Sequence, residues 1–256
     1  MSATSATEAL RAENLSKRFG HVTALDGVSM HLARGEMLGI LGDNGAGKST
    51  LIKILTGFHQ PDAGRVFVNG QPVRLASVDE ARAFGIECVY QDLALVSGVP
   101  IYLNLFLNRE LLRPGPLRLL NHREMRKRAA AALADIGIHV ASVDLEVGAL
   151  SGGQRQAIAV ARAVISNARI LLLDEPLAAM GAREAALIIA LIERLKARGD
   201  IAIAMIAHNY AQTLEICDRV MLMQHGQVTF ESPAAQTSPA ELLEIVRREY
   251  RAARVS

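Results

Sequence analysis

A glycine-rich segment directly after a short apolar run constrains this chain more than any other feature. Residues 37–41 read MLGIL, and residues 42–50 read GDNGAGKST. The second segment fits G-x-x-x-x-G-K-[ST], a loop between a strand and a helix whose backbone N–H groups surround phosphate. The sequence therefore predicts a strand over 37–41, a phosphate-binding loop (residues 42–50, the phosphate loop) and a helix over 48–56.

Two side chains of the phosphate loop have distinct expected roles. Lys48 reaches the β- and γ-phosphates of a nucleotide, and Ser49 offers its hydroxyl to Mg²⁺. The residues expected to bind the nucleotide (ATP, by the resemblance given below) through this loop are Gly42, Asp43, Asn44, Gly45, Ala46, Gly47, Lys48, Ser49 and Thr50.

A second candidate phosphate site lies about a hundred residues later. Ser151, Gly152, Gly153 and Gln154 (the SGGQ turn) are expected to open a helix, with Ser151 and Gln154 as a capping box. Each glycine costs about 1 kcal/mol relative to alanine within a helix, which indicates that the backbone must lie close to another group. An anion at the helix N-terminus is the expected neighbour, and a partner subunit's γ-phosphate fits because this helix is not the one after the phosphate loop. The alternative is a helix start with no ligand.

Two adjacent carboxylates end another apolar run. Residues 170–173 read ILLL, and Asp174, Glu175 and Pro176 follow. A buried strand that delivers charge to its tip is costly unless a cation compensates it. Asp174 is therefore expected to hold Mg²⁺ through its water shell, and Glu175 to take a proton from an attacking water. The alternative is that these residues only cap the next helix.

Three further residues complete the expected site. Gln91 and His208 each follow a predicted strand, and parallel strands would bring their ends to one sheet edge. Gln91 would contact Mg²⁺ or the lytic water, while His208 would bind the γ-phosphate and hold the water and Glu175 in place. Phe19 is expected to stack on adenine, and the alternative is a core aromatic residue.

Composition narrows the function classes. The chain has 256 residues, with 28 basic and 26 acidic side chains and a net charge of +2, which gives no electrostatic case for nucleic acid. No apolar run approaches the ~18–20 residues of a membrane span, and the N-terminus lacks a secretory signal. Cys88 and Cys217, the two cysteines, are expected to be buried thiols.

Strands alternating with helices predict an α/β fold with a mostly parallel sheet. We expect one domain over 1–256, in which 8–91 and 151–256 form the sheet core with a β-subdomain. Residues 92–150 contain Pro100, Pro114 and Pro116 and are expected to form a mainly helical insertion. Capping boxes predict helices starting near Ser77 and at Asn121.

The order of these segments resembles that of the ATP-binding subunits of ABC transporters. Five ordered motifs carry the resemblance: the phosphate loop, Gln91, LSGGQ at 150–154, DEP at 174–176 and His208. Segments 77–82 (SVDEAR), 89–95 (VYQDLAL), 104–107 (NLFL) and 207–209 (AHN) resemble the ATPases of bacterial ribose, xylose and fructose importers. The resemblance implies a P-loop NTPase fold with an antiparallel β-subdomain and a helical insertion.

The resemblance also implies partners and a location. Two copies would form a head-to-tail homodimer around two ATP molecules with Mg²⁺, each ATP between one phosphate loop and the other copy's SGGQ turn. Dimer closure and hydrolysis would drive uptake of a small sugar through integral-membrane permease subunits, supplied by a periplasmic or extracellular sugar-binding protein. The chain would be a peripheral protein on the cytoplasmic face of the inner membrane, and nucleic acid would not be among its partners. Leu93, Leu95, Val96 and Val99 would line the permease groove or pack inside the insertion.

One segment departs from the pattern, and other functions compete. Residues 177–181 read LAAMG where most relatives carry Thr or Ser and then SALD, a loop that links the two ATP sites.

Two other functions are alternatives to sugar import: a soluble ABC-type ATPase of a macromolecular machine, and an importer of a non-sugar solute. A small-molecule kinase would leave the SGGQ turn without an explanation.

Overall fold

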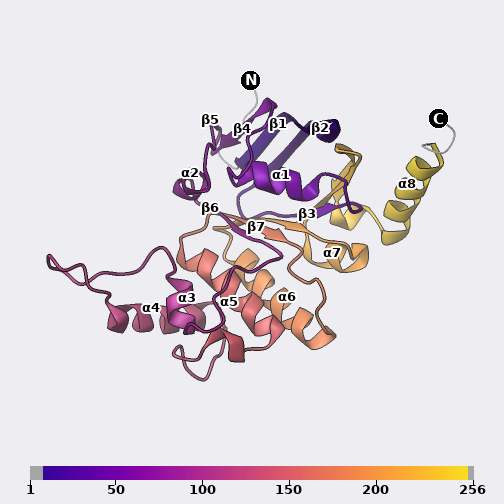
Figure 1. Ribbon diagram of the computed structural model, residues 1–256. Helices are drawn as coiled ribbons and strands as arrows, with labels where there is room; N and C mark the ends of the chain where they lie inside the picture. The colour runs from indigo at the N-terminus through magenta and orange to yellow at the C-terminus, as the bar shows by residue number, and fades with distance from the viewer. Residues whose placement is uncertain (1–7, 253–256) are drawn as a thin grey trace.

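Helix α1 (Lys48–Leu55) lies between two β-sheets, and further helices cover the outer face of the larger sheet (Figure 1). The computed structural model describes residues 8–252. The larger sheet has six strands in the order β10-β9-β3-β8-β7-β6. Its strands are β3 (Met37–Leu41), β6 (Ile86–Val89), β7 (Ile170–Asp174), β8 (Ala202–Ile206), β9 (Arg219–Gln224) and β10 (Gln227–Pro233).

All strands of this sheet except β10 run parallel. Ala204 on β8 is in register with Leu38 on β3 and with Leu172 on β7. Because parallel strands end at the same edge, the segments after β3, β6, β7 and β8 emerge together. These four segments are the phosphate loop and those carrying Gln91, Glu175 and His208, as the sequence predicts.

The central strands are buried on both faces. In β7, Leu171 and Leu173 join a core with the helices of the outer face, whereas Ile170 and Leu172 join a second core with α1 and the smaller sheet. This alternation follows from the two-residue period of a strand, and burial on both faces explains the continuous apolar runs in the sequence.

The smaller sheet is antiparallel, with the strand order β2-β1-β4-β5. Its strands are β1 (Glu8–Phe19), β2 (Val22–Ala33), β4 (Ala63–Val68) and β5 (Gln71–Val73). Asn69 and Gly70 form the turn between β4 and β5, both with positive φ (51° and 76°). Such φ values suit Asn and Gly better than other residues.

Three helix starts agree with their sequence signals. Helix α2 (Val78–Ala83) is capped by Ser77, helix α4 (His122–Asp135) by Asn121, and helix α5 (Gly152–Ile165) by a complete capping box of Ser151 and Gln154. Helices α6 (Ala182–Ala197), α7 (Tyr210–Ile216) and α8 (Pro239–Ala252) follow α5, with the short 3₁₀ helix η2 (Ala234–Gln236) before α8. No described helix combines the length and apolar character needed to cross a membrane.

Residues 92–150 are less helical than the sequence predicts. They contain α3 (Ile101–Leu105), α4 and the short 3₁₀ helix η1 (Val147–Ala149), and loops form most of the segment. Between α3 and α4 the chain projects as a long loop, closed by a bridge between Leu112 and Leu120 (Figure 1). Pro114, Gly115 and Pro116 lie at its tip and cannot continue a helix, which explains the difference.

Both cysteines are free, Cys217 buried and Cys88 half-buried. Burial raises the pKa of both thiols, that of Cys217 to about 12. Neither thiol is therefore a nucleophile at neutral pH, in agreement with the expected structural role.

The register of the large sheet makes Leu172→Ala a test of the fold. Leu172 is fully buried in the centre of β7, so its truncation should lower the free energy of unfolding by about 2–5 kcal/mol. Leu243→Ala on α8 serves as the control, because Leu243 is 45% exposed and should change stability by less than about 1 kcal/mol. Urea denaturation of both variants measures the difference, and equal losses would contradict the burial of β7 in the sheet.

Candidate active site

Two glycines allow the phosphate loop to fold against its neighbours. Gly42 and Gly47 have φ values of 143° and 100°, and an added Cβ would clash with the carbonyl oxygens of Met223 and Ala24, respectively. Glycine is needed at both positions, because other residues rarely adopt such φ values and have no room there. The loop is therefore fixed against the end of β9 and the start of β2.

Lys48 reinforces the same loop from inside. Its Nζ donates to the carbonyl oxygens of Gly42 (2.7 Å) and Asp43 (2.9 Å), and the side chain is buried. Burial lowers the pKa of Lys48, while the charges of Glu175, Asp43 and Asp174 act in the opposite direction. A cation is thus held at the N-terminus of α1 (Lys48–Leu55), whose first turn contains no acidic side chain.

An open pocket of about 300 Å³ lies over this helix N-terminus. Residues 44–50 of the phosphate loop line one side, and Glu175, directly after β7, also lines it. Val22, Thr23 and Ala24 of β2 line the other side. Sequence reasoning missed these three residues, because only the close approach of Gly47 to Ala24 brings β2 to the loop and no local pattern encodes that contact.

Glu175 and His208 form a hydrogen-bonded pair at the edge of this pocket. The Nε2 of His208 lies 2.6 Å from the Oε1 of Glu175. Glu175 has a φ of 53°, an unfavourable conformation for a residue with a side chain, directly after β7. Its N–H still donates to the carbonyl oxygen of Ile206 at 3.2 Å, which extends the ladder with β8. Backbone strain of this kind is typical of functional sites.

Asp174 is the buried neighbour of this pair. Burial raises its pKa, as does the charge of Glu175, and Lys48 acts against both. Among residues 8–252, no group of three or more His, Cys, Asp or Glu side chains could hold a metal ion. Asp174 and Ser49 offer hard oxygen ligands, which suit a Mg²⁺ ion that completes its coordination with water and phosphate oxygens.

Several expected site residues lie outside the lining of the pocket, and Gln91 and Phe19 are two of them. Gln91 is exposed, two residues beyond β6. Phe19 is 43% exposed at the end of β1, where its ring contacts His59 edge-on (centroids 5.2 Å apart) and Lys17. Phe19 pairs with Val22 across the β1–β2 hairpin, so it lies beside the pocket wall.

The structure separates the SGGQ turn from the phosphate loop. None of residues 151–154 lines the pocket over α1. The turn instead lies at the start of α5, where the N–H of Gly153 donates to the carboxylate of Glu184 on α6 at 3.1 Å. Sequence reasoning also missed Glu184, although a glutamate at the third position of a helix is a recognisable capping signal.

The loop after Gln91 is held by two side chains. Arg162 of α5 donates to the carbonyl oxygens of Leu93 and Ala94, both at 2.8 Å. The buried side chain of Asn104 bonds both backbone groups of Val96. Leu93 and Leu95 pack partly against the core, whereas Val96 is 45% exposed. The expected groove residues therefore divide between internal packing and open surface.

A further hollow of about 330 Å³ lies behind Glu175. Leu177 and Met180 line it together with His208, and both pack partly against the core beside α5 and α6. Apolar packing therefore anchors the segment 177–181, the one that departs from the family pattern.

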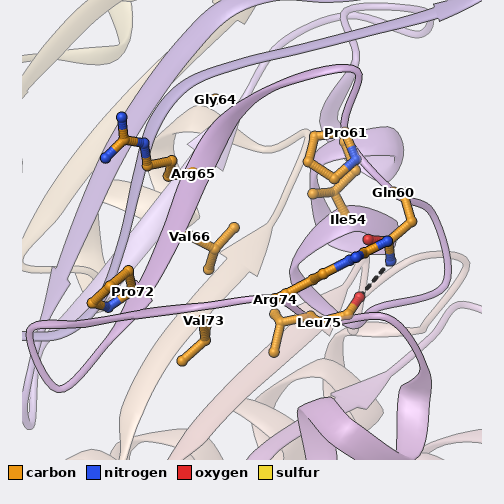
Figure 2. Close-up of a pocket in the computed structure, with 10 residues that line it drawn as sticks. All are labelled: Ile54, Gln60, Pro61, Gly64, Arg65, Val66, Pro72, Val73, Arg74 and Leu75. Carbon is orange, nitrogen blue, oxygen red and sulfur yellow. Dashed lines mark hydrogen bonds between the residues drawn. The ribbon is translucent and has the colours of Figure 1, made fainter.

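Another hollow, of about 470 Å³, lies at the other end of α1 (Figure 2). Ile54, Val66, Val73 and Leu75 form its apolar lining, and Gln60 donates to the Leu75 carbonyl oxygen at its side (Figure 2). None of its lining residues is acidic, a serine, a cysteine or a histidine. It therefore lacks the groups needed for hydrolysis.

Comparisons with known proteins agree with this geometry. The family model described as ABC transporter matches residues 25–178. The xylose/arabinose import ATP-binding protein XylG of Sulfolobus acidocaldarius is 42% identical over 94% of each chain. The fructose import ATP-binding protein FrcA of Rhizobium meliloti is 41% identical over 85% of each chain.

Solved structures resemble the fold as well. An ATP-binding cassette of an ABC transporter in its ADP conformation has a TM-score of 0.81 and 29% identity, covering 93% of this chain and 98% of that one. A second cassette, solved as a dimer in a post-hydrolysis state with ADP and phosphate, has a TM-score of 0.74 and 25% identity, covering 88% and 98%.

Gly47→Ala should weaken nucleotide binding by the phosphate loop. The added Cβ clashes with a backbone carbonyl oxygen, so the loop must move. Gly45→Ala is the matched control: φ at Gly45 is also positive (83°), but the added Cβ meets nothing within 4 Å. Titration with a fluorescent ATP analogue should show at least about a tenfold greater Kd for Gly47→Ala than for Gly45→Ala. Equal affinities would contradict the assigned loop packing.

Proposed function

Because the chain belongs to the ABC transporter family, we propose that it is the ATP-hydrolysing subunit of an importer for a monosaccharide. The observation that carries this proposal is that Glu175, paired with His208, lines the pocket formed by the phosphate loop. The names of the two relatives given above, which refer to xylose, arabinose and fructose, support a small sugar as the transported solute.

The phosphate loop binds the triphosphate of ATP. Backbone N–H groups at the start of α1 face the pocket, and a phosphate there gains from the helix dipole as well as from these donors. Lys48 turns its ammonium from the loop carbonyls toward the β- and γ-phosphates. Ser49, Asp174 and Gln91 would hold Mg²⁺, with Asp174 acting through the water shell of the ion, and Gln91 could contact the lytic water instead. The ion would compensate the charge of the phosphates.

Hydrolysis consumes ATP and water and releases ADP and phosphate. The Glu175 carboxylate accepts a proton from the attacking water, whose oxygen forms the new bond to the γ-phosphorus while the bond to the β-phosphate oxygen breaks. His208 orients Glu175 through its 2.6 Å hydrogen bond and binds a γ-phosphate oxygen. Phe19, beside the pocket wall, stacks on the adenine ring.

A second copy of the chain completes the site. The SGGQ turn lies outside the pocket of its own chain, and it presents a helix N-terminus suited to phosphate. A head-to-tail homodimer places each turn over the partner's ATP, at two sites. The segment 177–181 lies beside Glu175 and leads into α6, so it links the two sites.

Dimer closure moves the permease. We assign residues 8–91 and 151–256 to the sheet core with its β-subdomain and 92–150 to an insertion, all within one ATP-binding domain. The exposed part of the loop after Gln91, around Val96, contacts permease subunits at the cytoplasmic face of the membrane. A periplasmic or extracellular sugar-binding protein delivers the solute to the permease.

Glu175→Gln tests the proposed base. Gln cannot accept the proton, so the rate of ATP hydrolysis should fall by at least about 100-fold, while ATP binding persists and an ATP-dependent dimer accumulates. The control, Glu215→Gln, changes an exposed carboxylate on α7 and should keep the wild-type rate. Phosphate release and size-exclusion chromatography measure the two effects. An undiminished rate of ATP hydrolysis in Glu175→Gln would contradict the assignment of Glu175 as the general base.

Purification from membranes tests the importer proposal. The tagged chain, gently solubilised from its own cell membranes, should retain a polytopic permease that mass spectrometry identifies. The binding protein encoded with that permease should bind a monosaccharide in calorimetric titrations. Recovery with ribosomal, DNA-bound or metabolic-enzyme partners would contradict the proposal, and a non-sugar ligand would limit it to import of another solute.

A further inference from the structure

The glycines of the SGGQ turn pack against one carboxylate of their own chain. The N–H of Gly153 donates to the Oε1 of Glu184 at 3.1 Å. An added Cβ at Gly153 would lie 2.9 Å from the Cβ of Glu184, closer than real side chains approach, and one at Gly152 would lie 3.5 Å from Oε1. Glu184 is therefore the close neighbour that Gly153 indicates, and it lies in ordinary contact range of Gly152.

The same carboxylate serves two helix N-termini. Glu184 is the third residue of α6, whose N-cap residue, Gly181, has no side chain to cap the helix. The pKa of Glu184 lies below its ordinary value because Gly153 donates to it, with further hydrogen bonds from the Ser151 side chain and the Gly181 backbone. One anion thus joins the start of α5 to the segment 177–181.

A phosphate at the SGGQ turn would need the donors that Glu184 uses. Helix N-termini attract a single anion within the first turn, and a carboxylate and a phosphate at the same N–H group repel each other. Glu184 is only partly buried, so its side chain has space to rotate toward solvent. Binding of one anion therefore excludes the other.

We propose that Glu184 occupies, in the free chain, the place that the γ-phosphate of the partner's ATP takes in the closed dimer. Glu184 thereby sets the ATP concentration at which two chains close. When Glu184 leaves this place, α6 also loses a cap, so binding of the phosphate changes the contacts of the segment 177–181. This inference rests on the proposed head-to-tail dimer.

The test uses the full-length chain carrying Glu175→Gln, which retains ATP. Sedimentation velocity with Mg²⁺ and increasing ATP gives the midpoint of dimer formation. Adding Glu184→Gln, which keeps a hydrogen-bond acceptor but removes the charge, should lower this midpoint about three- to tenfold. Glu184→Ala should lower it at least as much. Glu193→Gln, an exposed carboxylate on the same helix, should leave it unchanged.

The sign of the change separates competition from simple bracing of α5 against α6. If Glu184 only braces α5 against α6, its substitution should raise the midpoint, most of all in Glu184→Ala. An unchanged or higher midpoint in Glu184→Gln therefore overturns the inference. With Glu175 intact, Glu184→Gln should lower the KM for ATP and leave kcat within about twofold. If the Glu175→Gln variant forms no dimer with ATP, the result contradicts the proposed function itself. If it forms a dimer whose midpoint is the same with Glu or Gln at position 184, the result contradicts only this inference.

Discussion

The parallel pairing of β3, β8 and β7 is the constraint on which the rest of the structure depends. Each strand is buried on both faces, and their register brings three chain segments to one sheet edge. The phosphate loop follows β3, Glu175 follows β7, and His208 follows β8. A one-residue slip would exchange the two faces of a strand and displace the segment at its end, so core packing and site geometry are specified together.

Charge at this edge is arranged by burial. Lys48 and Asp174 are both largely removed from water. Burial lowers the pKa of Lys48 and raises that of Asp174, which favours the neutral form of each side chain. The charge of each side chain acts in the opposite direction and favours the ionised form of the other. A bound nucleotide with Mg²⁺ would add negative charge beside Lys48 and positive charge beside Asp174. The unliganded site is therefore complementary to such a ligand before it binds.

Much of this could be predicted from the sequence, because short patterns encode it. The phosphate loop, the capping box at Ser151 and the Asn69-Gly70 turn depend on neighbouring residues, and the structure contains all three. The contacts of Val22–Ala24 and of Glu184 were not predicted, since they join segments distant in the chain. The helical content of 92–150 was overestimated, because the cap at Asn121 indicates where a helix starts but not how much loop precedes it.

The central claim is that two chains share each ATP, and a crystal structure of the Glu175→Gln variant with ATP and Mg²⁺ tests it most directly. The account predicts a head-to-tail dimer with two ATP molecules, in which Lys48 of one chain and Ser151 of the other contact the same γ-phosphate. ATP bound on the phosphate loop and covered only by residues of the same chain would contradict it.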